Sequence, residues 1–224
     1  MRRENGRNSA PLYENGKRVF DKTAAALGIA VTLPIWAVAI VGIELSDPGP
    51  VFYKAHRVGE GNKEFEMYKF RSMRVDKSAD EKGFKADRNR IFAFGEFMRS
   101  TKIDELPQLL NILRGEMSIV GPRPASVDQV EMVRSGRNCV VSGVKPGLTG
   151  PSALYDYIYG DQVEDEEEYR EKVLPSRLAL DVYYVDRRDM LYDLKMIKDT
   201  VLCILCTLTN VFPEELFNEL VEVA

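Results

Sequence analysis

The chain has few of the residues that support redox or zinc chemistry, with three cysteines and one histidine among 224 residues. Three cysteines cannot build a complete disulfide framework, and none is spaced from the histidine like a zinc ligand set. These counts exclude a disulfide-rich secreted module and favour a reducing compartment. Cys203 and Cys206 form a CxxC, but apolar residues fill and flank it. We therefore interpret them as packing residues one helical turn apart.

The chain also has no large excess of charge of either sign. A formal net charge of -4 gives no reason to expect nucleic acid as a partner. The apolar fraction of 45% and the charged fraction of 29% are typical of a folded chain and exclude a long disordered one. Its length suits one sizeable domain, and no internal repeat or low-complexity linker divides it.

One long stretch without charge, residues 23–43, stands out near the N-terminus. As a straight helix it would extend about 32 Å, which is long enough to span a bilayer core. No small-residue cleavage site follows it, so it does not resemble a secretory signal peptide. Basic residues beside such a stretch favour contact with an anionic membrane surface. Those that precede it are Arg2, Arg3, Arg7, Lys17, Arg18 and Lys22.

Pro34 lies near the middle of this stretch and predicts a break in the helix. Its missing N–H leaves the carbonyl of Ala30 without a helical partner, and the hydroxyl of Thr32 could bond back to the carbonyl of Gly28. Two arms of about 16 Å each would reach only half of a hydrocarbon core. Basic residues on both sides place both ends in the cytoplasm. The pattern favours a re-entrant hairpin but leaves open an ordinary spanning helix with a tolerated proline.

Turn and strand signals follow the apolar stretch. Residues 47–50 read Asp-Pro-Gly-Pro, which ends a helix. Residues 51–53 and 65–70 have strand composition and surround a glycine-rich turn at 59–62, so we expect a β-hairpin. Residues 92–100 carry apolar side chains at helical spacing and predict a helix.

Two adjacent acids, Asp104 and Glu105, stand at the start of a predicted amphipathic helix. Pro107 suits its first turn and Gly115 its end. Carboxylates at a helix start have a purely structural explanation, capping of free N–H groups, worth about 1 kcal/mol. Two neighbouring acids could instead hold a divalent ion, attack phosphorus or take a proton. The apolar stripe of this helix consists of Leu106, Leu109, Leu110, Leu113 and Met117.

A third feature is Arg123, which lies between Pro122 and Pro124 just after a short apolar strand at 118–120. An arginine on a rigid backbone loses little further entropy when it forks around a phosphate. The alternative is a rigid surface turn with a solvated side chain.

Taken in order, these segments resemble the bacterial sugar transferases, the monotopic phosphoglycosyl transferase family. Each motif alone is weak, but the ordered set is specific and covers most of the chain. The residues that carry the resemblance are 17–21, Pro34, 47–53, 57–59, 68–73, 99–100, 103–109, 115–124, 145–150 and 181–185.

The resemblance implies a two-step reaction on a UDP-sugar, the first step of cell-surface glycan or exopolysaccharide assembly. Asp104 would attack the β-phosphorus, release UMP and hold the phosphosugar covalently, and membrane polyprenyl phosphate would then accept it. Glu105 would assist proton handling, and Mg²⁺ would sit at Asp104. Positioning and charge neutralisation dominate phosphoryl transfer, which agrees with such a site. The resemblance assigns phosphate binding to Arg123, and shaping of the site to Lys69, Arg99 and Asp181.

The expected fold is α+β and anchored at the cytoplasmic face of the bacterial inner membrane. Residues 1–46 would form the re-entrant helix-break-helix with Thr32 and Pro34. Residues 47–224 would form the catalytic domain, in which a small β-hairpin sheet and amphipathic interfacial helices pack around the acids. Apolar stripes within 191–205 and 212–220 are candidates for those helices. A homodimer is a further expectation.

Two departures from the family pattern leave details open. Residues 151–154 and a tyrosine-rich loop at 156–160 differ from the usual residues, so the sugar is not determined, and 187–189 leave the local helix cap undetermined. There are two rival functions. An idle membrane scaffold of a glycan assembly complex would not need the acids or Arg123, and a soluble metal hydrolase would not need Pro34 or the uncharged stretch.

Overall fold

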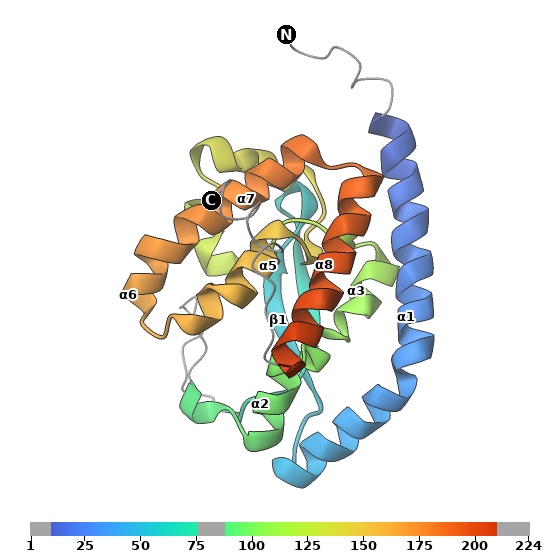
Figure 1. Cartoon of the computed structure of the whole chain (residues 1–224), viewed down its shortest axis with the longest axis vertical. Coiled ribbons are helices and arrows are strands. Elements are labelled where there is room, and N and C mark those ends of the chain that lie inside the picture. Colours follow the sequence, from blue (N-terminus) through green and yellow to red (C-terminus); the bar gives the residue numbers. More distant parts are fainter. Residues whose placement is uncertain (1–9, 76–87, 210–224) are drawn as a thin grey trace.

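The N-terminal part of the chain is one long bent helix. The computed structural model describes residues 10–75 and 88–209, and α1 covers Ala10–Ser46. Figure 1 shows α1 along one side of the molecule, with a bend after which it turns towards α2. Among the described residues, α1 is the one helix long and apolar enough to cross a membrane by length and composition. It ends directly before residues 47–50, as the sequence predicts.

Thr32 and Pro34 explain the local structure of α1. The Thr32 hydroxyl donates to the carbonyl oxygen of Gly28 at 2.6 Å, which confirms the predicted bond, and Trp36 Nε1 donates to Thr32 Oγ1 at 3.1 Å. Pro34 lies inside the helix, which continues through it. The expected two-armed break is therefore a bend within a continuous helix, because side-chain hydrogen bonds and the flanking turns hold the backbone where proline removes a donor.

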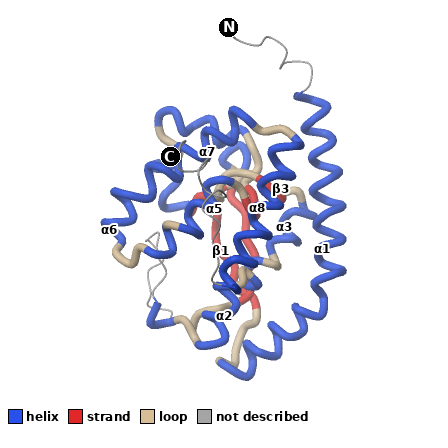
Figure 2. The backbone as a smooth tube through the Cα atoms, viewed as in Figure 1, coloured by secondary structure: helices blue, strands red, loops and turns tan. Residues whose placement is uncertain are grey.

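Two small sheets lie near the centre of the molecule, with helices around them (Figure 2). β1 (Phe52–Val58) pairs antiparallel with β2 (Glu64–Phe70), and β4 (Ala125–Ser126) joins the other edge of β1. β3 (Ser118–Val120) and β5 (Gly147–Thr149) form a parallel pair. The hairpin is confirmed, with a first strand longer than residues 51–53. The strand predicted at 118–120 is confirmed as β3, but its pairing with β5 was not predicted.

Helices supply most of the remaining structure, and the mixed helix and sheet content confirms the α+β class. Gly115 ends α3 with a φ of 81°, a left-handed conformation that glycine adopts without strain. Residues 156–160, expected as a loop, lie largely in α5 instead. The α-helices after α1 are α2 (Ala93–Ser100), α3 (Gln108–Arg114), α4 (Val130–Val133), α5 (Pro151–Ile158), α6 (Glu166–Glu168), α7 (Leu174–Arg187) and α8 (Met190–Thr209).

Short helical turns lie between several of the helices and strands. α2 and α8 confirm the helices predicted at 92–100 and around 191–205. The apolar stripe predicted within 212–220 lies outside the described residues. The short turns are η2 (Glu60–Asn62), η3 (Arg88–Arg90), η4 (Ile103–Glu105), η5 (Val127–Gln129), η6 (Gly136–Gly143), η7 (Gly160–Gln162) and the π-turn η8 (Tyr169–Val173).

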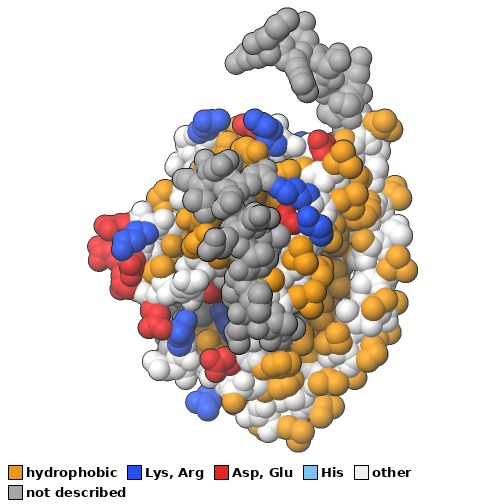
Figure 3. Space-filling view, in the orientation of Figure 1, with side chains coloured by type: hydrophobic (Ala, Val, Ile, Leu, Met, Phe, Trp, Pro, Cys, Tyr) orange, Lys and Arg blue, Asp and Glu red, His pale blue; other side chains and the backbone are white. Residues whose placement is uncertain are grey.

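One face of α1 packs against the rest of the protein along much of the helix. Ala25 belongs to a core cluster with Leu109, and Ala39 and Ile43 pack in another with Phe70. The opposite face is apolar and exposed, and Figure 3 shows hydrophobic side chains along α1 with few charged ones among them. The exposed apolar side chains of α1 include Leu27, Val31, Leu33, Val38, Val41 and Leu45.

Candidate active site

The two adjacent acids lie in η4, the turn that leads into α3. Lys102 precedes this turn in a left-handed conformation with a φ of 57°. Neither η4 nor α3 has a side-chain hydrogen bond at its N-cap. The capping explanation for Asp104 and Glu105 therefore has no support in the geometry, and the carboxylates are available for other partners.

Glu105 is held by a lysine from the central hairpin. Lys69 Nζ in β2 lies 2.7 Å from Glu105 Oε1, so the structure brings these two predicted site residues together. Burial opposes ionisation of Glu105, but the charges of Lys69 and Lys102 and the hydrogen bond from Lys69 outweigh it and lower its pKa to about 2. Glu105 is therefore a carboxylate over the whole physiological pH range.

Asp104 lies in a different environment from its neighbour. Its side chain is buried, with 4% of the residue exposed, and its Oδ1 has no hydrogen-bond partner among the described residues. Burial raises its pKa to about 6, against the opposing charges of Lys69 and Arg99. A buried carboxylate oxygen without a partner is costly to keep. Such an oxygen is available to interact with a ligand that binds in the site.

Arg123 follows β3 and is held through its backbone as well as by its two prolines. Its N–H donates to Asp181 Oδ1 at 3.1 Å, and the same oxygen accepts a hydrogen bond from Ser152 Oγ at 2.5 Å. Burial raises the pKa of Asp181 to about 6. Asp181, which α7 provides, thus anchors the arginine loop.

The side chain of Arg123 lies within electrostatic range of the acid pair. Its positive charge contributes to the low pKa of Glu105, while its guanidinium Nη2 lies 3.3 Å from Asp156 Oδ2. Arg99 likewise acts on Asp104 through its charge. The predicted residues Lys69, Arg99 and Arg123 therefore place positive charge near the pair, which favours the binding of an anionic group.

Three residues at the start of the turn that carries the acids, or in contact with it, were not predicted. Lys102 Nζ lies 3.4 Å from Asp161 Oδ2 and 4.0 Å from the centre of the Tyr157 ring. The Tyr157 hydroxyl donates to the carbonyl of Ser100 at 2.7 Å. These contacts join α5 and η7 to the turn that carries the acids. The sequence signal for Tyr157 is the tyrosine-rich stretch at 156–160, where this protein departs from the family pattern.

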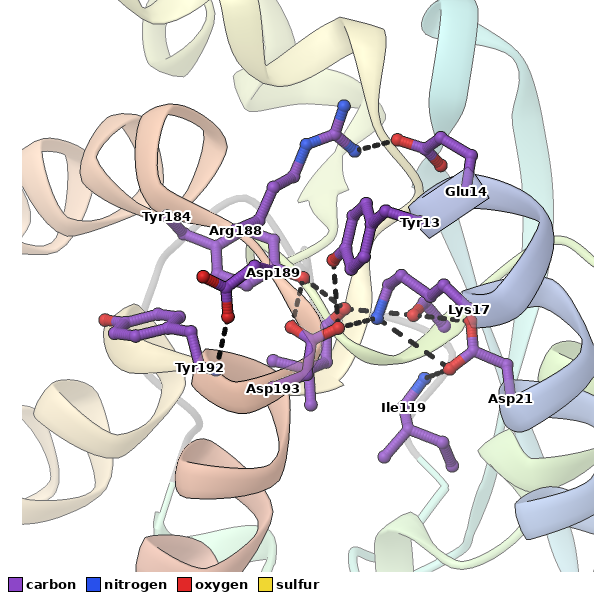
Figure 4. A network of polar contacts seen from close by, with 12 residues as sticks. Tyr13, Glu14, Lys17, Asp21, Ile119, Tyr184, Arg188, Asp189, Tyr192 and Asp193 are labelled. Atoms are coloured by element: carbon purple, nitrogen blue, oxygen red, sulfur yellow. Dashed lines mark hydrogen bonds and ion pairs between the residues drawn. The ribbon is translucent and has the colours of Figure 1, made fainter. Parts of the chain in front are cut away.

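A second polar cluster joins α1 to the C-terminal helices, as Figure 4 shows. Lys17 Nζ lies 2.7 Å from Asp193 Oδ2, which also accepts a hydrogen bond from the Tyr13 hydroxyl at 2.9 Å. Asp21 accepts hydrogen bonds from Ser118 Oγ at 2.8 Å and from the backbone N–H of Ile119 at 3.1 Å. The interpretation of Lys17 as a membrane-facing cation is wrong, because its charge is buried and paired.

Two smaller sequence questions are also answered. Asp189 accepts a hydrogen bond from the backbone N–H of Tyr192 at 2.8 Å and so caps the start of α8. Cys203 is fully buried, Cys206 is partly buried, and neither forms a disulfide, which agrees with a packing role. No group of three or more metal-ligating side chains lies together in the described ranges 10–75 and 88–209.

Comparison with known sequences identifies the family. The family model of the bacterial sugar transferases matches residues 12–207. The chain belongs to this family. A UDP-glucose:undecaprenyl-phosphate glucose-1-phosphate transferase of Xanthomonas campestris is 34% identical over 207 residues, which are 91% of this chain and 41% of the relative. This bacterial sugar transferase thus spans less than half the length of that protein.

Two further relatives of this sugar transferase carry the names of different sugars. A UDP-glucose:undecaprenyl-phosphate glucose-1-phosphate transferase of Caulobacter vibrioides is 34% identical over 85% of this chain and 70% of the relative. A UDP-N-acetylgalactosamine-undecaprenyl-phosphate N-acetylgalactosaminephosphotransferase of Aeromonas hydrophila is 33% identical over 88% of this chain and 45% of the relative. The family alone therefore does not determine the sugar.

Proposed function

We propose that this protein transfers a sugar-1-phosphate from a UDP-sugar to membrane polyprenyl phosphate and releases UMP. The observation that carries the proposal is the buried Oδ1 of Asp104, for which the described part of the chain offers no hydrogen-bond partner. The positive charges of Lys69, Arg99 and Lys102 act on this carboxylate. A carboxylate in that setting can attack an electrophilic phosphorus, while the cations neutralise the oxygens around it. The three relatives support the same donor and acceptor classes through their names.

The proposed reaction has two displacements at phosphorus. In the first, a carboxylate oxygen of Asp104 bonds to the β-phosphorus, and the bond from that phosphorus to the bridging oxygen breaks. UMP leaves with the electron pair, and the phosphosugar remains on Asp104 as an acyl phosphate. In the second, an oxygen of polyprenyl phosphate attacks the same phosphorus and displaces the carboxylate. The products are polyprenyl diphosphate sugar and regenerated Asp104.

Glu105 has a role that follows from its partner. With a pKa of about 2 it is a weak base while Lys69 is bound to it. We therefore assign it first the task of holding Lys69 close to Asp104. Proton handling by Glu105 requires that Lys69 move towards the diphosphate, which would release the carboxylate and raise its pKa.

We expect a magnesium ion to bind at this site together with the substrate. Mg²⁺ commonly binds one or two protein carboxylates together with substrate phosphates and water. Asp104 would supply one such carboxylate ligand. The ion would neutralise charge on the diphosphate and assist departure of UMP.

The anchor of this enzyme is proposed to be re-entrant and to remain on the cytoplasmic side. Lys17 near one end of α1 contacts Asp193, and Ile43 near the other end packs with Phe70 of β2. A helix that crossed the bilayer would carry one of these ends away from the catalytic domain. The exposed apolar face of α1 is then available to the lipid, which holds the acids near the depth of a lipid phosphate. The homodimer stays a prediction.

The decisive experiment combines UMP release with capture of the covalent intermediate. Purified protein in detergent is mixed with Mg²⁺, polyprenyl phosphate and each of several UDP-sugars. We expect UMP release from at least one donor, an added sugar phosphate on the peptide that contains Asp104 by mass spectrometry, and no release by Asp104→Asn. Asp186→Asn, an exposed carboxylate paired with Arg137, is the matched control and should remain active. Turnover by Asp104→Asn would remove Asp104 as the nucleophile, and inactivity of the unaltered protein would favour the idle scaffold.

A further inference from the structure

A buried chain of polar contacts extends away from the guanidinium of Arg123. Arg123 Nη2 lies 3.3 Å from Asp156 Oδ2. The other oxygen of Asp156 accepts a hydrogen bond from the Tyr169 hydroxyl at 2.5 Å, and that hydroxyl accepts one from Arg177 Nη1 at 2.7 Å. The four residues come from the loop after β3, from α5, from η8 and from α7, so the fold rather than local sequence assembles them.

Of these four residues, only Arg123 faces outward. The side chain of Arg123 is 40% exposed, whereas Asp156, Tyr169 and Arg177 are all buried. Asp156 lies in the stretch where this chain departs from the usual family residues, so the family resemblance assigns it no role. A buried carboxylate that touches an exposed arginine of the site is well placed to determine where that arginine points.

The surroundings keep Asp156 charged. Burial opposes its ionisation, but the charges of Arg123 and Arg177 and the hydrogen bond from Tyr169 outweigh it and hold its pKa below the usual value. Gly160 approaches so closely that any Cβ at this position would collide with Asp156 Oδ1. The space around the carboxylate is thus occupied on several sides, which restricts its own movement.

We propose that Asp156 is a positioning residue that holds the guanidinium of Arg123 in the orientation that grips substrate phosphate, with Tyr169 and Arg177 holding Asp156. This inference rests on the proposed transferase function. The two prolines and Asp181 fix only the backbone of Arg123, and its long side chain still has several rotatable bonds. One contact to Asp156 restricts these rotations and occupies only part of the guanidinium, which has several N–H donors in a fixed fork that matches phosphate.

The test is a double-mutant cycle between Asp156 and Arg123, measured as kcat and KM for UMP release. In the unaltered background we expect Asp156→Asn to lower kcat/KM about tenfold, because the ion pair with Arg123 is lost. In the Arg123→Lys background, which keeps the positive charge but not the fork, Asp156→Asn should change kcat/KM by no more than about twofold. Such non-additivity is expected if Asp156 acts through Arg123 and not through general stability.

Two further variants keep the test interpretable. Tyr169→Phe removes only the hydroxyl that holds Asp156 and should show the same loss and the same dependence on Arg123, which answers the question even if Asp156→Asn folds poorly. Asp186→Asn in α7 should leave kcat/KM unchanged. Equal losses in both Arg123 backgrounds, or no loss in the unaltered one, would overturn the proposal. If the unaltered enzyme itself released no UMP, the transferase function would fail first, and this inference with it.

Discussion

The ammonium of Lys17 lies 2.7 Å from the carboxylate of Asp193, across 176 residues of sequence and in the interior of the protein. Asp193 is fully buried and also accepts hydrogen bonds from the hydroxyls of Tyr13 and Tyr184, at 2.9 and 2.8 Å. This pair attaches the N-terminal part of α1 to α8. It therefore contributes to holding the anchor against the catalytic domain.

We predict that Lys17→Met destabilises the folded protein by about 3–5 kcal/mol, because Asp193 is left buried and unpaired. Thermal unfolding in detergent measures the effect, and Lys22→Met, an exposed lysine of the same helix, is the matched control. Lys17→Met combined with Asp193→Asn should regain part of the loss, since no unpaired charge is then buried. Equal melting temperatures for the Lys17 and Lys22 variants would contradict this role.

Asp104→Asn should stabilise the protein while it abolishes activity. Burial raises the pKa of Asp104 to about 6 in the folded state, so ionised Asp104 opposes folding by about 3 kcal/mol above that pH. The cost is absent below the unfolded pKa of about 4, where the carboxyl is neutral in both states. The gain in melting temperature should thus be largest near neutral pH and shrink as pH falls from about 6 to about 4. A gain independent of pH would show that burial of this charge is not its cause.

The rate of UMP release should fall in acid. A protonated Asp104 cannot attack phosphorus, so we expect kcat/KM to decline by about tenfold per pH unit below about pH 6. Glu105, whose pKa is about 2, stays ionised in this range and should not contribute. Initial rates between about pH 5 and 8 measure the profile, and enzyme returned to neutral pH controls for denaturation. A flat profile over this range would be inconsistent with a nucleophile in the environment described for Asp104.

The orientation of α1 can be tested by cysteine labelling in intact cells. Asn15 is exposed near the start of α1, and Cys139 is an exposed natural cysteine of the catalytic domain. We expect Asn15→Cys and Cys139 to be protected together from a membrane-impermeant maleimide and to react together once the cells are opened. Mass mapping identifies the labelled peptides, and a periplasmic cysteine protein is the positive control. Labelling of Asn15→Cys alone from outside would establish a spanning helix.

The features that the sequence determined are those with local causes. Proline, glycine and the spacing of apolar residues act over a few neighbours, so the end of α1 at Ser46, the β1–β2 hairpin and the left-handed end of α3 at Gly115 could be predicted. The ordered motifs also predicted Asp104, Glu105, Lys69, Arg123 and Asp181 as residues of one site. In the structure Lys69 contacts Glu105, and Asp181 accepts a hydrogen bond from the backbone N–H of Arg123.

Only the tertiary structure decided the partners of the charged groups. Lys17 and Lys22 look alike in the sequence, yet one is buried against Asp193 and the other is exposed. The sequence predicted a loop at Asp156, whereas in the structure this residue belongs to α5 and contacts Arg123. The physical reason is that the energy of a charged group depends on its burial and on its partners, which can lie anywhere in the chain. Neither the burial nor the partners can be predicted from the neighbouring residues in the sequence.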